Sequence, residues 1–320
     1  MTTDETYMQR CIQLAKLGLG DVQPNPMVGA VIVHNGHIIG EGYHQKYGEA
    51  HAEVNAINSV KDKSLLSEST IYVSLEPCSH YGKTPPCADK LIEMGFPRVV
   101  VGATDPHDKV NGKGIDKLRN AGIDVTTGIL LAECEKLNKR FFTYHKKQRP
   151  YIILKWAQTA DGFMDIERPN ANPNYWITND ELRVIVHKWR SEEQAILIGY
   201  NTYINDRPQL TTRLYPGKNP IKYLMTHSPE SAPIENFRLI PNNLQKAMQQ
   251  LYDDRIQSII VEGGRKTLDL FLGNDLWDEA RVLVGTPVWG KGTPAPVMSQ
   301  SADDEMTVNG NRILWYNHSL

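Results

Sequence analysis

Hydrophobic positions in the first 145 residues alternate between helical spacing and short apolar runs. Helical spacing occurs in residues 7–17, 52–60, 88–94, 115–121 and 131–145. Strand-like runs occupy residues 27–33, 37–43, 71–75 and 98–103, and another short strand is expected near residue 124. Asn35-Gly36, between the first two runs, is typical of a tight hairpin turn. This alternation predicts a mixed sheet with helices on both faces.

The polar, basic stretch Lys146–Pro150 interrupts this pattern and predicts a domain boundary, with domains at residues 1–147 and 148–320. Beyond the boundary the alternation resumes, without an internal repeat. Helical spacing occurs in residues 179–190, 243–252 and 268–272. Strand-like runs occupy residues 151–156, 195–199, 222–225, 258–261, 279–284 and 312–316. We therefore expect a second α/β domain.

Length and composition support this division. A chain of 320 residues corresponds to roughly two domains. The formal net charge of −2 argues against a nucleic-acid partner, because such proteins usually present a basic face. A small anionic substrate needs only one local basic pocket. No apolar run approaches the roughly 18 residues that cross a bilayer. The N-terminus is polar and acidic, so a cytoplasmic protein with no membrane partner is expected.

The four cysteines fall into two kinds. Cys11 and Cys134 lie in helical stretches, and we expect both to be small buried hydrophobic residues. Cys78 and Cys87 each follow a proline directly in a loop. Since nothing in the sequence suggests export, disulfide bonds are not expected.

His51 together with Cys78 and Cys87 supplies three zinc ligands. Three protein ligands are typical of a catalytic zinc site, because the fourth tetrahedral position stays open for water. Glu53 follows the histidine by two residues and is free to move protons. His-x-Glu followed by Pro-Cys and a later Cys is the signature of zinc deaminases. The loop between the cysteines, residues 79–86, is longer than in that signature.

Each of these residues alone has a simpler interpretation. His51 could be a hydrogen-bonded residue at a helix start, and the cysteines could be half of a structural zinc site. A closed structural site would need a fourth ligand, for which His80 is the near candidate. The conjunction of three ligands, a spare carboxylate and two prolines favours a catalytic zinc.

Longer motifs carry a family resemblance in this half. They are residues 24–29 (PNPMVG), 42–44 (GYH), 51–54 (HAEV) and 76–87 (EPCSHYGKTPPC). With them the N-terminal half resembles the deaminase domain of the bifunctional riboflavin-biosynthesis deaminase/reductase family. The resemblance implies a cytidine-deaminase-like, three-layer α/β/α domain with zinc on His51, Cys78 and Cys87 and Glu53 as the proton shuttle. It further implies contacts to the pyrimidine and ribose phosphate from Asn25, His44, His80, Lys83 and Asp105.

The stretch after Asp105 departs from the family pattern. His107 and Asp108 stand where the family usually has asparagine and proline. A substrate role for His107 is therefore not carried over.

In the second half, Glu262-Gly263-Gly264 ends a strand and leads into a helix. Bare glycine amides can approach a phosphate closely, but such turns are common and do not decide a function. Gly199–Thr202 is a similar signal. The dinucleotide fingerprint Gly-x-Gly-x-x-Gly is absent from the sequence, which argues against a Rossmann domain.

Several motifs of this half resemble the reductase domain of the same family, which is similar in fold to dihydrofolate reductase. They are Leu154-Lys155, Asp161-Gly162, Trp176–Thr178, Gly199–Thr202, Asn205–Thr211 and Val261–Gly264. By position, the resemblance implies that NADPH contacts Gln158, Trp176, Thr202, Asp206 and the turn Gly264, Arg265, Lys266, Thr267, Leu268, Asp269 and Leu270. It assigns the ribosyl phosphate to Lys155, Asn174, Arg190, Leu210, Arg213 and Glu262. Arg190 and Arg213 make physical sense as a pair of phosphate clamps. Gln158 departs from the small residue often found at its position.

The sequence thus predicts a bifunctional enzyme of riboflavin synthesis that uses zinc and NADPH. One domain would deaminate a phosphorylated pyrimidine, and the other would reduce its ribosyl group to ribityl. We expect a homo-oligomer, either a dimer or a tetramer. Two alternatives stay open at this point: a zinc deaminase acting on nucleic-acid bases, and a nucleotide-binding regulator with a structural zinc. The charge of −2 speaks against the first, and the spare carboxylate of Glu53 speaks against the second.

Overall fold

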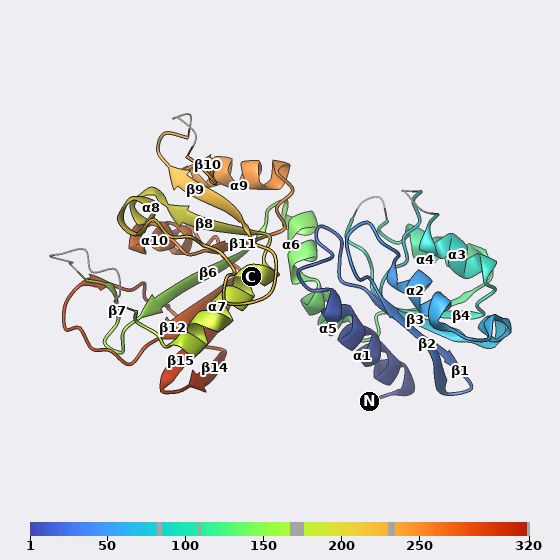
Figure 1. The fold of residues 1–320 in the computed structure, drawn as a ribbon. Helices are drawn as coiled ribbons and strands as arrows, with labels where there is room; N and C mark the ends of the chain where they lie inside the picture. The colour runs from blue at the N-terminus through green and yellow to red at the C-terminus, as the bar shows by residue number, and fades with distance from the viewer. Residues whose placement is uncertain (82–84, 108–109, 167–175, 230–233, 319–320) are drawn as a thin grey trace. The chain divides into compact units, whose positions relative to one another are not determined.

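The computed structural model describes residues 1–320 except 82–84, 108–109, 167–175, 230–233 and 319–320. The chain forms two compact units, Met1–Lys147 and Gln148–Leu320 (Figure 1). Among the described residues, every helix is too short or too polar to cross a lipid bilayer.

The first unit is built on a mixed sheet with the strand order β2-β1-β3-β4-β5. Its strands are β1 (Gly29–His34), β2 (His37–Tyr43), β3 (Thr70–Leu75), β4 (Arg98–Ala103) and β5 (Asp124–Thr127). β1 is antiparallel to both of its neighbours, whereas β3, β4 and β5 are parallel. The parallel strands therefore end at one common edge, where ligands usually bind in such sheets.

Helices cover both faces of this sheet, because successive strand residues point to opposite sides. The helical segments are α1 (Thr3–Ala15), η1 (Lys16–Gly18), α2 (Ala52–Ser59), η2 (Lys63–Glu68), α3 (Cys87–Glu93), α4 (Lys113–Asn120), α5 (Leu131–Leu137) and α6 (Lys139–Lys147). In β1, Ile32 packs in the core formed with α2, α3 and α4. Its neighbours Val31 and Val33 pack in the core formed with α1, α5 and α6. The predicted three-layer architecture is confirmed.

The prediction of a single helix over residues 131–145 is wrong. The segment forms two helices, α5 and α6, which are separated by Asn138. The Asn138 side chain accepts a hydrogen bond from the Met27 amide and donates one to the Met27 carbonyl, both at 2.8 Å. This pair of bonds to a segment 111 residues away interrupts the helix.

The second unit contains a sheet with the order β10-β9-β8-β11-β6-β12-β15-β14. Its strands are β6 (Tyr151–Gln158), β8 (Ala195–Gly199), β9 (Ile221–Thr226), β10 (Arg238–Pro241), β11 (Ser258–Val261), β12 (Glu279–Val284), β14 (Asp304–Val308) and β15 (Asn311–Asn317). Strands from β10 to β12 in this order are parallel, and β15 is antiparallel to both β12 and β14. A small ribbon pairs β7 (Phe163–Asp165) with β13 (Thr293–Pro294).

Helices also lie on both faces of the second sheet. They are α7 (Asp180–Glu192), α8 (Tyr200–Asp206), α9 (Leu244–Asp253) and α10 (Arg265–Gly273). Leu251 of α9 and Phe271 of α10 pack against one face. Trp189 of α7 packs against the other face, beside Ile153 and Ile260. The predicted pair of α/β folds is therefore confirmed, and the ends of β8 and β11 bring Thr202 and Glu262 to the same edge.

Candidate active sites

Three predicted metal ligands meet at the end of the first sheet. His51 precedes α2, Cys78 follows β3, and Cys87 is the first residue of α3. His51 Nδ1 lies 3.6 Å from Cys78 Sγ and 3.3 Å from Cys87 Sγ. All three ligand atoms lie within 4.8 Å of one another. Among the described residues, His80 is not a member of this group.

The spacing of these atoms fits a tetrahedral zinc ion. With zinc–sulfur and zinc–nitrogen bonds of about 2.3 and 2.0 Å, a tetrahedral edge measures roughly 3.5 Å. The two observed nitrogen–sulfur distances lie close to that value. The donor set is also the one zinc prefers, since thiolate and imidazole are its usual protein ligands.

The local structure stabilises a thiolate at Cys78. Hydrogen bonds with Cys87 and with the His51 ring lower the pKa of the Cys78 thiol to about 4, although burial opposes them. The backbone amide of Cys87, at the start of α3, also donates to Cys78 Sγ at 3.3 Å. The contact with Cys78 in turn raises the pKa of His51 to about 9. A metal ion that binds all three atoms must therefore displace the proton of the imidazole.

Glu53 lies in the first turn of α2 and is only 3% exposed. Burial raises the pKa of its carboxyl above the ordinary value, and the negative charge of Cys78 adds to this effect. The interactions that shift its pKa come from His51, Cys78 and Cys87, so the carboxyl lies beside the ligand cluster. It is therefore placed to exchange protons with a molecule held there.

Asn25 and His44 form a pair next to the cluster. His44 is 3% exposed, and its Nδ1 lies 3.0 Å from the Ala50 carbonyl, to which it donates. Its Nε2 then accepts from the Asn25 amide nitrogen at 3.1 Å. The His44 ring also meets His51 edge-on, with ring centroids 5.4 Å apart. In this arrangement His44 orients the Asn25 side chain.

The remaining residues assigned to this site from the sequence differ in their placement. Asp105 is buried after β4, and burial raises the pKa of its carboxyl to about 6. His80 is exposed on the loop after Cys78. Lys83 lies outside the described residues. His107 donates from its backbone amide to Asp105 and places its ring 4.7 Å from that of His145.

Glu76 is a buried carboxylate that sequence reasoning missed. One oxygen accepts from the amides of Asp105 and Gly112 at 3.2 and 2.9 Å. The other accepts from the amides of Gly114 and Ile115, at 2.9 and 3.2 Å, at the start of α4. Glu76 therefore joins the Cys78 loop to the segment that carries Asp105. The signal in the sequence was its position directly before Pro77-Cys78. The strand ends at Leu75 and does not need a charged residue there, so the carboxylate could be expected to have another role.

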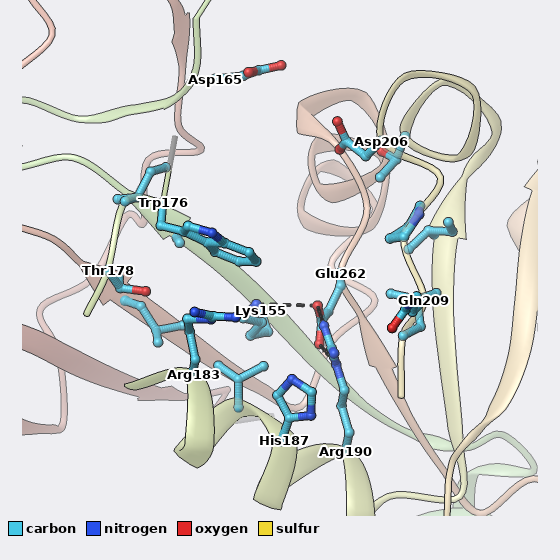
Figure 2. Close-up of a pocket in the computed structure, with 18 of the residues that line it drawn as sticks. Lys155, Asp165, Trp176, Thr178, Arg183, His187, Arg190, Asp206, Gln209 and Glu262 are labelled. Atoms are coloured by element: carbon cyan, nitrogen blue, oxygen red, sulfur yellow. Dashed lines mark hydrogen bonds and ion pairs between the residues drawn. The ribbon is translucent and has the colours of Figure 1, made fainter. Parts of the chain in front are cut away.

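A cavity of about 760 Å³ opens at the edge of the second sheet (Figure 2). It is lined by eight of the residues assigned from the sequence: Lys155, Trp176, Arg190, Thr202, Asp206, Leu210, Arg213 and Glu262. They come from strands, helices and loops up to 107 residues apart. Asn174, also assigned there, lies outside the described residues.

Glu262 lies between two cations at this cavity. Its carboxylate accepts from Arg190 Nε and Nη2 at 2.9 and 2.7 Å and from Lys155 Nζ at 3.3 Å. Burial alone would raise the pKa of Glu262, but Arg190 and Lys155 outweigh it and hold the pKa at about 2. For Lys155 burial is the largest effect: it lowers the pKa of the amine, and the charge of Glu262 opposes it. Arg190 is thus held by Glu262, and it also donates to the Thr211 carbonyl at 3.2 Å.

The turn assigned to the cofactor lies at the start of α10. The Gly264 amide donates to Thr202 Oγ1 at 2.8 Å, which fixes the turn against α8. Gly199 and Gly263 both lie so near Thr267 that an added Cβ would come within 2.5 Å of it. The Arg265 side chain is bound to Asp269 and to the Pro294 carbonyl. The backbone of this turn, rather than its side chains, is therefore suited to receive a phosphate.

Some residues assigned to the cofactor do not line the cavity. Gln158 accepts from Trp156 Nε1 at 2.9 Å, and Leu268 is completely buried in the core. Gly264, Arg265, Lys266, Thr267, Asp269 and Leu270 are also outside its lining. Conversely, Arg183 and His187 line the cavity and were missed. Their spacing from Arg190, at i, i+4 and i+7, is the signal that could have revealed a polar face of α7.

Comparison with known proteins connects both sites to one family. Residues 1–103 match the cytidine and deoxycytidylate deaminase zinc-binding region, and residues 150–310 match the RibD C-terminal domain. Riboflavin biosynthesis protein RibD of Aquifex aeolicus is 39% identical over 90% of this chain and 88% of its own length. The chain belongs to the RibD family.

Other relatives agree with this family assignment. A diaminohydroxyphosphoribosylamino-pyrimidine deaminase of Buchnera aphidicola is 51% identical over 43% of this chain and 93% of its own length. The crystal structure of a bifunctional deaminase and reductase from Thermotoga maritima covers 98% of both chains, with 36% identity and a TM-score of 0.87. This RibD-family chain is accordingly a bifunctional enzyme of riboflavin biosynthesis, a zinc-dependent deaminase and an NADPH-dependent reductase.

Proposed function

We propose that Met1–Lys147 deaminates the diaminopyrimidinone ribosylamino 5′-phosphate and that Gln148–Leu320 then reduces its ribosyl group to ribityl. The observation that carries the first half is the buried Glu53 carboxyl beside three converging ligands. The second half is supported by the polar cavity at the end of β6 and β11. Its volume is within the range of small-molecule sites.

In the deamination, His51, Cys78 and Cys87 hold zinc, and Glu53 moves the protons. Bound zinc supplies a Lewis acid that makes water nucleophilic at neutral pH. Glu53 takes a proton from the attacking water and delivers protons to the ring nitrogen and to the departing amine, which leaves as ammonia. Asn25, oriented by His44, binds the ring edge. His80, Lys83 and Asp105 complete the proposed substrate contacts.

In the reduction, the residues of the cavity position two bound molecules. NADPH supplies the hydride that reaches the sugar C1′. Trp176, Thr202, Asp206 and the backbone of the Gly264–Leu270 turn hold the cofactor; Gln158 is assigned to it only by family position. Lys155, Asn174, Arg190, Leu210, Arg213 and Glu262 bind the substrate, and Arg190 also fixes Glu262.

The direct test incubates the purified chain with the diaminopyrimidinone substrate. Ammonia release and loss of NADPH absorbance are followed separately, with NADH as the comparison cofactor. We expect ammonia release in the absence of both NADPH and NADH. NADPH oxidation should follow only after deamination. NADPH oxidation without prior ammonia release would contradict the proposed order.

Removing one zinc ligand should abolish deamination. In Cys87→Ala, two ligands remain, so we expect bound zinc to fall from one ion per chain to nearly none and ammonia release to be lost. Metal content is measured by atomic emission after gel filtration. Cys134→Ala is the matched control, because Cys134 is also buried but lies in the other core of the same unit. Full zinc content in Cys87→Ala would contradict the assignment.

Replacing Glu76 should impair deamination without removing zinc. In Glu76→Gln the amide NH₂ would replace one carboxylate oxygen and face the two backbone N–H groups that donate to it, which leaves buried donors unpaired. The displaced Asp105 segment should lower the deamination rate by about 10- to 100-fold, since small misplacements have effects of this size. Zinc content and NADPH oxidation should stay unchanged. Glu68→Gln, at an exposed position of the same unit, is the control.

Two further features are proposed on more general grounds. The phosphorylated substrate and NADPH do not cross membranes freely, which supports action in the cytoplasm. The family resemblance supports a homo-oligomer, a dimer or a tetramer. Light scattering on the eluting protein measures the mass directly, and a mass of about one chain would contradict the second proposal.

A further inference from the structure

A guanidinium covers one face of the Trp176 indole at the cavity of the second unit. The guanidinium carbon of Arg183, from the first turn of α7, lies 4.1 Å from the centre of the Trp176 ring. A planar guanidinium at this distance stacks on an indole and is attracted by its electron-rich face. Both residues line the cavity, and Figure 2 shows them next to each other. Trp176 is nevertheless 56% exposed, so its other face is open to a molecule in the cavity.

Arg183 has a second contact that holds it in this position. Its Nη1 donates to Asp180 Oδ1 at 2.6 Å. The two residues are three apart on α7, where side chains are neighbours on one side of the helix. The Asp180 side chain is largely exposed, so this ion pair contributes little to stability. It does keep the guanidinium on the side of the helix that carries Trp176.

The main chain that follows Trp176 is anchored independently of this stack. A Cβ added to Gly285 would collide with the Ile177 carbonyl oxygen, so the segment lies directly against the end of β12. Asn179 caps α7 with its side-chain oxygen, and its Nδ2 donates to the Val308 carbonyl at 3.0 Å. These contacts fix the backbone but not the rotation of the indole about its side-chain bonds. The stacked guanidinium is therefore the contact that orients the ring.

We propose that Arg183 is a positioning residue of the reductase, which holds the Trp176 indole so that its uncovered face stacks on the nicotinamide ring of NADPH. The proposal rests on the reduction assigned above to the second unit. Planar rings attract each other in offset stacks. Lys155 and Glu262, which are assigned to the substrate, border the same space as Trp176 (Figure 2). The nicotinamide is the ring of the cofactor that must reach the substrate, so it is the ring expected beside Trp176.

A double-mutant cycle tests whether Arg183 acts through Trp176. A cation–π contact corresponds to a roughly 2- to 30-fold change in binding. We expect Arg183→Leu to weaken NADPH binding by a factor in this range, measured by titration calorimetry. In a chain that already carries Trp176→Leu, Arg183→Leu should have no further effect, because the ring that it positions is gone. Arg183→Lys keeps the charge without the planar group, so it should recover only part of the affinity.

A second ligand distinguishes this stack from direct binding of a phosphate by Arg183. Adenosine 2′,5′-bisphosphate has the adenosine end of NADPH and lacks the nicotinamide. All variants should bind it as the wild type does, which also shows that they are folded. Arg238→Leu is the matched control, because its guanidinium lies 6.0 Å from the Tyr223 ring at an exposed position outside the cavity lining. Equal losses for both ligands, additive effects in the cycle, or unchanged NADPH affinity in Arg183→Leu would overturn the proposal.

Turnover identifies which bound ring lies against Trp176. With the deaminated substrate, Arg183→Leu should raise the KM for NADPH and lower kcat, because a misplaced nicotinamide transfers hydride more slowly. The KM for the substrate should stay unchanged. A raised KM for the substrate with an unchanged KM for NADPH would place the pyrimidine there instead and overturn the proposal. Absence of NADPH oxidation by the wild type would refute the reductase function itself, so the two failures are distinguishable.

Discussion

Glu53→Gln is expected to abolish deamination while zinc stays bound. Glutamine has nearly the shape of glutamate, so it fits the same buried position, which is only 3% exposed. Its amide neither accepts a proton from water nor delivers one to the leaving amine. General acid–base groups contribute about 10²- to 10⁴-fold, and we expect ammonia release to fall by at least the upper part of this range. Ammonia is measured in a coupled assay under saturating substrate.

The second activity of the chain provides an internal control for this variant. Glu53→Gln should oxidise NADPH at the wild-type rate when it is given the already deaminated substrate. Its zinc content should equal that of the wild type, since the three ligands are untouched. Glu41→Gln, which alters a partly exposed carboxylate paired with Arg10 in the same unit, should deaminate normally. If Glu53→Gln keeps a tenth or more of the wild-type rate, the proposed proton shuttle is wrong.

Local patterns explain what could be predicted from the sequence. The Asn35-Gly36 turn forms the hairpin between β1 and β2, and the continuous apolar run of β1 reflects its two covered faces. The chemistry of His51, Cys78 and Cys87 was recognisable because the ligand types and their order are specific. Such features depend on residues that are close in sequence or on motifs.

Long-range contacts explain what could not be predicted. The division of the helix at Asn138 depends on hydrogen bonds to Met27, 111 residues away. Arg190 is assigned to the substrate phosphate, but its ion pair with Glu262, which follows 72 residues later, could not be read from the sequence. His44 is assigned to the substrate site, but its burial and its bond to Asn25, which add an orienting role, could not be read from the sequence. In each case the partner is chosen by the packing of the sheet rather than by the local pattern.

Glu262→Gln is expected to abolish reduction and to destabilise the second unit. The substitution leaves Arg190 and Lys155 without a counter-charge in a site where their side chains are 12% and 14% exposed. Breaking a buried ion pair by removing one partner costs about 3–5 kcal/mol. Glu305→Gln is the matched control, because Glu305 pairs with Arg312 at the surface and such pairs contribute about 0–1 kcal/mol.

Unfolding of this unit can be followed selectively, because all six tryptophans of the chain lie in Gln148–Leu320. In urea, tryptophan fluorescence should show a lower unfolding midpoint for Glu262→Gln than for the wild type. The midpoint of Glu305→Gln should equal that of the wild type. The pKa of Glu262 is held at about 2, below its ordinary value near 4.5. Its contribution to the free energy of unfolding is therefore complete above pH 4.5 and is lost as the pH falls towards 2. The wild type should lose this contribution on acidification, whereas Glu262→Gln should lack it at every pH, and parallel pH profiles would contradict the assigned charge cluster.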